Sequence, residues 1–308
     1  MQIGIDLGGT KIEGIGLHAG ALAAAPRRLP TPRDSYPATL DAIARVVGEI
    51  EADAGGSGTV GIGIPGVVAR TTGLVKNANS TWLNGRPLLA DLETRLGRPV
   101  RVANDANCFA LSEAVDGAGQ DHEVVFGVIL GTGVGGGIVI RGRIHEGPNQ
   151  IAGEWGHNEL PWMTDEERQS ASQCYCGKAG CIETFLSGPG FERDTAQATG
   201  TRRSSQDIVR LAAAGETGAV QALERYGDRL ARALAGVIDV LDPDVIVLGG
   251  GMSNLPGLPA AVTDRLPRYV FSDTVITRVV PNVHGDSGGV RGAAWLWPAD
   301  GAPAWSPP

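Results

Sequence analysis

The sequence has few aromatic residues, only four cysteines and no long uninterrupted apolar segment. Aromatic side chains account for 5% of the 308 residues. A helix that crosses a bilayer needs about 20 consecutive apolar residues, so the lack of such a run excludes a membrane-spanning helix. No secretory leader pattern precedes the first apolar strand. We therefore expect a soluble cytoplasmic protein with no membrane partner.

Acidic residues outnumber basic ones, and glycine is abundant. The 34 Asp and Glu residues against 26 Lys and Arg give a formal net charge of −8. This acidity argues against a nucleic-acid partner. The 46 glycines suit tight turns and close backbone approaches, and the length suits two medium-sized domains or one large domain.

The N-terminal run I-G-I-D-L-G-G-T-K, residues 3–11, predicts a strand that ends in a glycine turn. A second apolar run at residues 12–17 follows at once, which favours a β-hairpin. Backbone N–H groups at such a turn can approach an anion, Lys11 can add positive charge, and Asp6 can hold a hydrated Mg²⁺. An ordinary tight hairpin would show the same pattern.

A second unit of the same kind follows later in the chain. Residues 123–130 predict a strand, residues 131–137 a glycine turn, and residues 138–140 another strand. The repeat indicates two related domains that hold a phosphate chain between them, although the acid of the first turn has no counterpart here. A dinucleotide site is disfavoured, because a helix rather than an apolar strand should follow its glycines.

A third glycine turn, residues 249–251, follows a predicted buried strand at residues 244–248 and precedes a helix. The bare backbone of this turn could lie against the adenine or ribose of a nucleotide. A plain strand-to-helix connection would have the same sequence pattern.

The residues between the two hairpins predict a mixed sheet flanked by helices. Residues 36–54 show helical apolar spacing, and residues 59–64 indicate a buried strand. Residues 99–103 predict a further strand. Asp105 comes soon after this strand, and a helix then runs to about residue 116. Asp105 can be the N-cap of that helix, or a general base at the open end of the sheet, where ligands bind.

Residues 76–85, K-N-A-N-S-T-W-L-N-G, predict a polar loop rich in amides. Planar amides can pair with sugar hydroxyls, and Trp82 offers a flat apolar face for a sugar ring. A plain Asn-rich surface loop would have the same composition.

One histidine and three cysteines have the spacing of a structural metal site. The histidine belongs to the run E-W-G-H, and the cysteines belong to C-Y-C-G-K-A-G-C-I-E. One imidazole and three thiolates suit tetrahedral zinc. The alternatives are reduced thiols, or one disulfide with a spare cysteine. The four candidate ligands are His157, Cys174, Cys176 and Cys181.

These motifs together resemble the ROK family of bacterial sugar kinases, repressors and open reading frames. The resemblance rests on I-G-I-D-L-G-G-T-K, A-N-D-A-N, E-W-G-H and the cysteine run, and it covers nearly the whole chain. The polar loop at residues 76–85 looks most like the fructokinase (manno(fructo)kinase) branch.

The resemblance implies an α/β, two-domain fold of the sugar kinase/Hsp70/actin (ribonuclease H-like) type. It implies duplicated mixed sheets and an interdomain cleft. Residues 1–116 and 289–308 would form the N-terminal lobe with the first phosphate hairpin, onto which the last helix crosses back. Residues 117–288 would form the C-terminal lobe with the second hairpin and the zinc loop.

The resemblance also implies a role for each candidate site residue. Asp105 would be the general base, and Asp6 would orient Mg²⁺ through water. The sugar-binding residues would be Gly66, Asn79, Asn104, Asp105, Glu154, His157 and Glu183. The phosphates of ATP would face Gly8, Gly9, Thr10, Lys11, Gly131, Thr132, Gly133 and Gly135. The adenosine would approach Gly249, Gly250 and Gly251, and zinc would bind His157, Cys174, Cys176 and Cys181.

The expected function is ATP-dependent phosphorylation of a free hexose, with fructose converted to fructose 6-phosphate as the first choice. Mannose, glucose or an N-acetylhexosamine such as N-acetylglucosamine is the alternative substrate, and a non-catalytic sugar sensor is the alternative class. A repressor is disfavoured, because a DNA-binding helix-turn-helix would precede the first hairpin. The family expectation for assembly is a homodimer.

Overall fold

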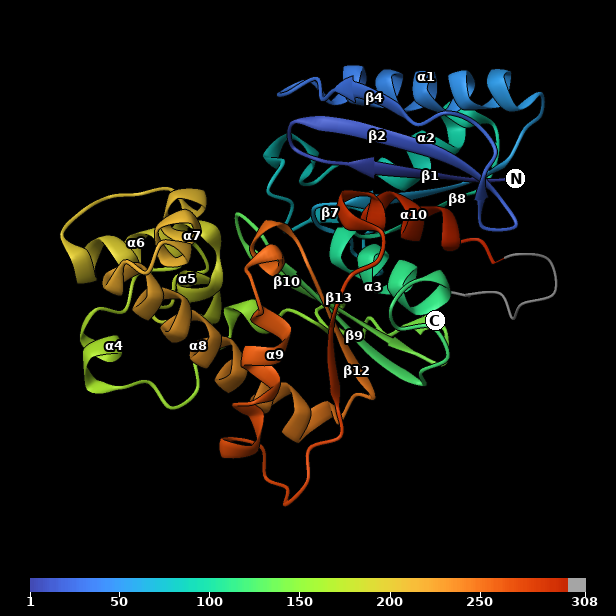
Figure 1. The fold of residues 1–308 in the computed structure, drawn as a ribbon. Helices are drawn as coiled ribbons and strands as arrows, with labels where there is room; N and C mark the ends of the chain where they lie inside the picture. The colour runs from blue at the N-terminus through green and yellow to red at the C-terminus, as the bar shows by residue number, and fades with distance from the viewer. Residues whose placement is uncertain (299–308) are drawn as a thin grey trace.

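The computed structural model describes residues 1–298, which form two large β-sheets with a pair of helices between them, and one two-stranded sheet (Figure 1). In the first sheet, β1 and β2 form the predicted antiparallel hairpin, and β5 and β8 continue from β1 in parallel. Its strands, from one edge to the other, are β3 (Ala21–Leu22), β2 (Lys11–His18), β1 (Gln2–Leu7), β5 (Thr59–Ile64) and β8 (Val100–Asn104), with β4 (Arg27–Pro30) also paired to β2.

The second sheet repeats this plan. The antiparallel hairpin of β9 and β10 is followed by β12 and β13, which run parallel to β9. The duplicated mixed sheets that the sequence predicts are therefore confirmed. The strands, in spatial order, are β11 (Arg143–Ile144), β10 (Val134–Ile140), β9 (Val124–Leu130), β12 (Val245–Gly249) and β13 (Arg278–Pro281).

Two helices, α3 (Asp105–Asp116) and α10 (Gly288–Trp295), fill the space between the sheets (Figure 1). Glycines make this close packing possible. A Cβ at Gly61 of β5 would clash with α10, and a Cβ at Gly137 of β10 would lie 2.5 Å from a carbonyl oxygen of α3. Where the two helices cross, a Cβ at Gly292 would overlap the carbonyl oxygen of Cys108.

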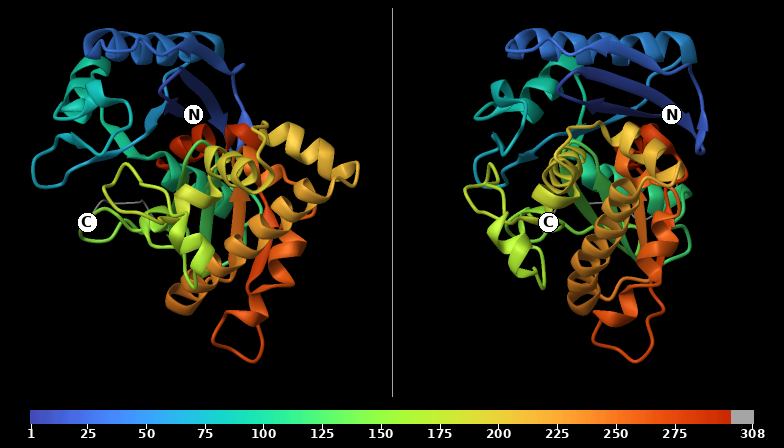
Figure 2. Two further views of the ribbon diagram at one scale, coloured as in Figure 1. Left: turned by 90° about the vertical axis from the view of Figure 1, so that its left-hand side faces the viewer. Right: turned by 60° about the vertical axis from the view of Figure 1, so that its left-hand side comes forward.

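The remaining helices lie outside the two sheets, and α4, α5, α6 and α7 form a group beside the second sheet (Figures 1 and 2). Two of them accompany the first sheet, and a small hairpin projects from the same half. The second sheet carries the larger group, of which α8 is the longest. On the first half lie α1 (Tyr36–Ala54), α2 (Leu88–Leu96) and the hairpin of β6 (Val67–Val68) and β7 (Val75–Lys76). On the second lie α4 (Asp165–Gln169), α5 (Ile182–Leu186), α6 (Gly188–Thr199), α7 (Ser205–Ala213), α8 (Thr217–Leu241) and α9 (Leu258–Thr263).

Most of the sequence-based element predictions match the structure. The helix expected at residues 36–54 is α1, whose side chains Ile43, Val47 and Ile50 are buried. One boundary is wrong, because β10 begins at Val134 and pairs with β9 along its whole length. Gly135 and the two glycines after it therefore lie in a strand, and the turn itself is confined to residues 131–133.

The division into two lobes remains a prediction. Separate apolar cores occupy the two halves, one between the first sheet and α1, the other between the second sheet and α8. The helix α3 follows β8 of the first sheet but packs on β9 and β10 of the second. Residues 299–308, which we assigned to the N-terminal lobe, lie outside the described residues. Within residues 1–298, no helix has the length and apolar character needed to cross a membrane.

Candidate functional site

A cavity of about 230 Å³ lies where the two halves of the molecule face each other. Its wall combines the β8–α3 junction and the loops after β5 and β7 with the β9–β10 turn and the segment around residues 154–183. All seven residues predicted to bind the sugar line this cavity. They are Gly66, Asn79, Asn104, Asp105, Glu154, His157 and Glu183.

The N-terminus of α3 separates the two roles considered for Asp105. The side chain of Asn104 is the helix cap: its Oδ1 accepts from the N–H groups of Ala106 at 2.9 Å and Asn107 at 3.3 Å. Asp105 is the first helical residue, and its Oδ1 accepts one further bond from Ala106 N–H at 2.8 Å. The capping function therefore belongs to Asn104, and Asp105 lines the cavity.

Asp6, near the end of β1, and Asp105, at the start of α3, both have raised pKa values. Burial raises the pKa of Asp105 to about 6, and the charge of Glu154 adds to the rise against the opposing hydrogen bond from Ala106 N–H. Burial, followed by the charges of Asp105 and Glu13, raises the pKa of Asp6 to about 7. A carboxylate with a pKa near neutrality suits a proton acceptor at physiological pH.

The opposite wall carries the acidic and imidazole groups. Glu183 lies at the start of α5, and its Oε2 accepts from Val134 N–H at 3.0 Å, which fixes it beside the glycine turn. The ring of His157 faces the cavity next to Tyr175, whose Oη lies 3.0 Å from Nε2. Glu154 precedes the 3₁₀ turn Trp155–His157, and Trp155 Nε1–H anchors that turn by donating to Gly135 O at 3.0 Å.

The four predicted zinc ligands converge behind the cavity. One donor atom from each lies within 4.8 Å of those of the other three. Cys176 Sγ and Cys181 Sγ are 3.6 Å apart, and Cys174 Sγ is 3.5 Å from His157 Nδ1. A tetrahedral zinc ion with Zn–S near 2.3 Å and Zn–N near 2.0 Å requires S–S and S–N separations of about 3.8 and 3.5 Å.

These distances fit a zinc ion and are too long for a disulfide. The imidazole of His157 would then use Nδ1 for the metal and leave Nε2 at the cavity. One residue thus connects the metal cluster with the wall of the cavity.

A second cavity, of about 670 Å³, opens on the other side of the β9–β10 turn. Gly131 and Thr132 line both cavities, so a molecule that occupied both would cross the backbone of this turn. The walls of the second cavity include Gly251, Met252 and Leu255, and their largely apolar character suits a nucleobase.

The other two glycines of the third turn have packing roles. A Cβ at Gly249 would lie 2.5 Å from the Phe109 ring, and Gly250 has a φ of 82° against the backbone of Leu130. Neither of them lines the second cavity, in contrast to Gly251.

The tip of the first hairpin lies outside both cavities. Lys11 Nζ forms an ion pair with the buried Glu13 at 2.9 Å. The guanidinium of Arg33 holds the tip by donating to Gly9 O at 3.1 Å and to Thr10 Oγ1 at 3.0 Å. The tip residues Gly8, Gly9, Thr10 and Lys11 remain predicted phosphate contacts.

Only part of the polar loop at residues 76–85 faces the sugar cavity, in contrast to the prediction. Asn77 and Asn79 line the sugar cavity. Trp82, expected to face a sugar ring, packs instead against the core beside α1 and donates from Nε1 to Thr39 Oγ1 at 3.3 Å. The Asn84 side chain fastens the loop through both backbone groups of Ala78.

Sequence reasoning missed three contributors to the site. Tyr175 lies within the cysteine run and could have been noticed there. Asn77 belongs to the polar loop but was not singled out. Arg33 reaches the hairpin tip only through the tertiary structure, and its exposed position in a loop gives no sequence signal.

Comparison with known proteins identifies the family that this chain resembles. A model of the ROK family matches residues 2–300. The N-acetyl-D-glucosamine kinase of Vibrio parahaemolyticus is 42% identical over 299 residues, which is 96% of this chain and 99% of that protein. The N-acetyl-D-glucosamine kinase of Escherichia coli O9:H4 is 43% identical over 301 residues, with the same coverage.

Solved structures of similar fold extend the comparison. The ROK hexokinase from Thermus thermophilus superposes with a TM-score of 0.84 at 31% identity, over 95% of this chain and 96% of that one. A ROK family glucokinase from Streptomyces griseus, in complex with glucose and AMPPNP, gives 0.77 at 29% identity, over 95% and 97%.

The fold, the cleft and these similarities define an ATP-dependent sugar kinase with the two-domain actin-like fold. The chain belongs to the ROK family. The expected likeness to the fructokinase branch is not supported, since these curated relatives are N-acetyl-D-glucosamine kinases.

Proposed function

We propose that this protein transfers the γ-phosphoryl group of ATP to a hydroxyl of N-acetyl-D-glucosamine. The observation that carries the choice of sugar is the set of full-length relatives at 41–43% identity that bear this activity in their names. The sugar cavity supports it as well, because it combines the amides of Asn77 and Asn79 with the apolar side chains of Pro65 and Val67. An acetamido group presents both an amide and a methyl group to its binding site.

Phosphoryl transfer depends on in-line positioning and charge neutralisation rather than on covalent chemistry of the protein. In our proposal, the sugar hydroxyl lies against Asp105, which accepts its proton as the hydroxyl oxygen attacks the γ-phosphorus, the bond from that phosphorus to the β,γ-bridging oxygen breaks, and ADP leaves. The turn Gly131–Gly133 separates the two cavities, so the phosphate chain would pass along its backbone N–H groups. Asp6 would orient Mg²⁺ through water, and the ion would supply charge neutralisation at the phosphates.

The remaining residues of the cavity would hold the sugar. Glu154, Glu183 and His157 Nε2 offer hydrogen-bond groups on one wall, with Asn104 and Asn79 on the other. At Gly66, a Cβ would come within 2.9 Å of Ala78, so the lack of a side chain lets the amide loop approach the cavity. Adenosine would occupy the second cavity near Gly251.

Fructose remains the second candidate substrate, followed by mannose and glucose. The sequence feature that favours fructose is the polar loop at residues 76–85, but only part of this loop faces the cavity. A sugar sensor without turnover is disfavoured by the raised pKa of Asp105 in a cavity that adjoins the nucleotide cavity. A cytoplasmic homodimer completes the proposal.

The test is ADP release by purified, zinc-replete protein with N-acetylglucosamine, N-acetylmannosamine, fructose, mannose and glucose. Substrates should be ranked by kcat/KM, because specificity is a ratio of these constants. We expect N-acetylglucosamine to rank first. A higher rank for fructose would restore the fructokinase assignment, and sugar binding without any ADP release would replace the kinase by a sensor.

A further inference from the structure

A short loop-rich segment separates the histidine ligand of the zinc cluster from its cysteines. Residues 158–173 contain one helix of five residues, α4, and otherwise consist of turns and loops, with isolated β-bridges that pair Glu159 with Cys181 and Gln173 with Ala179. The two bridges tie the ends of the segment to the cysteine run, so the part between them needs other tertiary contacts to hold it in place. Since His157 and Cys174 lie at its two ends, its position bears directly on the zinc cluster.

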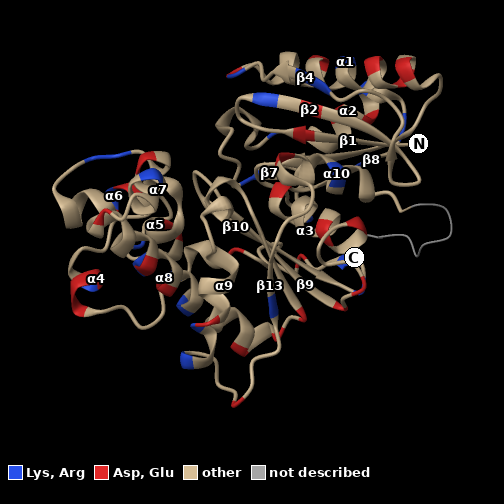
Figure 3. Ribbon diagram, viewed as in Figure 1, with Lys and Arg blue, Asp and Glu red and all other residues tan. Residues whose placement is uncertain are grey.

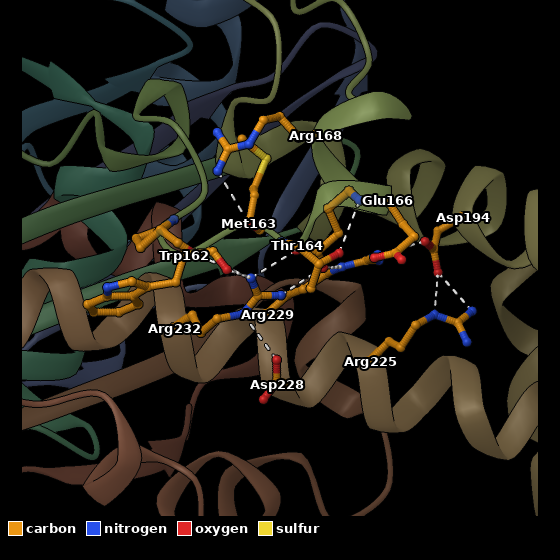
Figure 4. A network of polar contacts seen from close by, with 12 residues as sticks. Trp162, Met163, Thr164, Glu166, Arg168, Asp194, Arg225, Asp228, Arg229 and Arg232 are labelled. Atoms are coloured by element: carbon orange, nitrogen blue, oxygen red, sulfur yellow. Dashed lines mark hydrogen bonds and ion pairs between the residues drawn. The ribbon is translucent and has the colours of Figure 1, made fainter.

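The middle of this segment contacts a buried ionic cluster on α8, drawn in Figure 4. Glu167 of α4 accepts four hydrogen bonds. Arg229 Nε and Arg232 Nη2 donate to its Oε1, both at 2.7 Å, and Arg232 Nη1 and Thr164 N–H donate to its Oε2 at 2.9 and 3.0 Å. Glu167, Arg229 and Arg232 are each less than 10% exposed. Figure 3 shows basic and acidic residues together where α4 approaches α8.

Arg232 also holds the backbone before α4. Its Nη1 donates to Trp162 O at 2.9 Å and to Pro161 O at 3.2 Å. The Trp162 ring stacks on Tyr269 at a centroid distance of 5.6 Å, and Tyr269 Oη–H donates to Asp228, which also pairs with Arg232. The network therefore contacts the segment at three places: the carbonyls of Pro161 and Trp162, the Trp162 ring, and the Glu167 side chain.

From this network, direct packing leads to the zinc ligands. Met163, next to Trp162, lies against Gly180: a Cβ at Gly180 would be 3.2 Å from its Cε. Leu160 N–H donates to Gly180 O at 3.0 Å, and Gly180 immediately precedes Cys181. On the other side, Arg229 Cζ lies 5.0 Å from the centre of the Phe185 ring on α5, the helix that begins beside Glu183.

A buried ionic cluster of this kind contributes little net stability, and its main effect is to fix how α4 lies on α8. Desolvation of two guanidinium groups and a carboxylate offsets most of their mutual attraction, but removal of one partner leaves the others without compensation. Burial alone would raise the pKa of Glu167. The hydrogen bonds from Arg232, Arg229 and Thr164 outweigh it and hold the pKa at about 2. Glu167 is therefore ionised at every pH at which the enzyme would work.

We propose that Glu167, with Arg229 and Arg232, is a positioning cluster that fixes the zinc-bearing segment on α8 and thereby sets His157 and Glu183 at the sugar cavity. The part that concerns sugar affinity rests on the proposed function. The part that concerns zinc does not depend on which sugar is phosphorylated.

The experiment compares Glu167→Gln with Asp194→Asn in the zinc-loaded enzyme. Asp194 of α6 is a matched control, since it belongs to the same cluster but forms its ion pairs with Arg229 at 2.8 Å and Arg225 at 3.0 Å of α8, and not with residues 158–173. The readouts are the rate of zinc release to a chromogenic chelator, and the KM values for ATP and for the best sugar of the panel.

For Glu167→Gln we expect zinc affinity to fall and zinc release to accelerate by about 10-fold or more, as is typical when groups that orient metal ligands are lost. The KM for the sugar should rise by a similar factor, while the KM for ATP stays within about twofold. Asp194→Asn should leave zinc release and the sugar KM near those of the wild type. Equal effects of both substitutions, or unchanged zinc release in Glu167→Gln, would overturn the proposal.

A milder variant covers the case in which Glu167→Gln fails to fold. Arg232→Lys keeps the positive charge beside Glu167 but lacks the planar fork that reaches the Pro161 and Trp162 carbonyls. It should accelerate zinc release and raise the sugar KM, with the KM for ATP unchanged. Wild-type zinc release in folded Arg232→Lys would refute the role of the cluster, whatever sugar the enzyme prefers.

Discussion

The substitution Asp105→Asn tests the centre of the site, because the structure assigns the helix cap to Asn104 and we propose Asp105 as the general base. Loss of a general base should lower kcat by about 10²- to 10⁴-fold, or roughly 2.7–5.4 kcal/mol of barrier height. Binding should change little, since asparagine has the same shape and keeps the bond from Ala106 N–H.

Asp105→Asn should not destabilise the protein at pH 8, in contrast to loss of the Asn104 cap. The rise in the pKa of Asp105 from 3.8 to about 6 means that folding disfavours the ionised side chain. This amounts to roughly 3 kcal/mol at most near pH 8, above the folded-state pKa. Asp105→Asn should therefore raise the urea midpoint at pH 8 or leave it unchanged.

The control for this experiment is Asn104→Ala, which removes the observed cap of α3. It should cost about 1 kcal/mol of unfolding free energy, the typical value for an N-cap. The assays are ADP release at saturating sugar and ATP, and urea unfolding of both variants at pH 8. Near-normal turnover in Asp105→Asn would show that Asp105 is not the general base, and would refute our argument.

Three further predictions concern charge and packing. Glu154→Gln should shift the acid limb of the kcat/KM profile to lower pH by up to about one pH unit, because a like charge that raises the pKa of Asp105 is removed; an unmoved limb would contradict this electrostatic account. Gly292→Ala should lower stability by about 1–3 kcal/mol in urea titrations, since its Cβ would overlap the Cys108 carbonyl oxygen; a wild-type midpoint would show that α3 and α10 can separate freely. The pKa of Glu167 is lowered from 4.5 to about 2, so the stability advantage of wild type over Glu167→Gln, measured without zinc, should be constant above pH 4.5 and decline as the pH falls toward 2; a gap that stays constant down to pH 2 would contradict it.

Local sequence determined much of this protein. The hairpin at residues 2–18 follows from two apolar runs around a glycine turn, and α1 follows from apolar spacing with a glycine at its end. The zinc ligands were also readable, because three cysteines within eight positions need few other constraints to converge. The seven sugar-binding candidates came from the resemblance to the ROK family, and the structure gathers them in one cavity.

Tertiary structure decided the features that depend on distant partners. Sequence spacing left Asp105 with two roles, and the cap was assigned to Asn104 only by the observed hydrogen bonds. The polar loop did not reveal that Trp82 turns to α1, because either face of the loop could have met the core. The contact of Glu167 with Arg229 joins residues 62 positions apart. Short-range periodicity carries no information on such pairs, since the chain brings them together only when α4 folds onto α8.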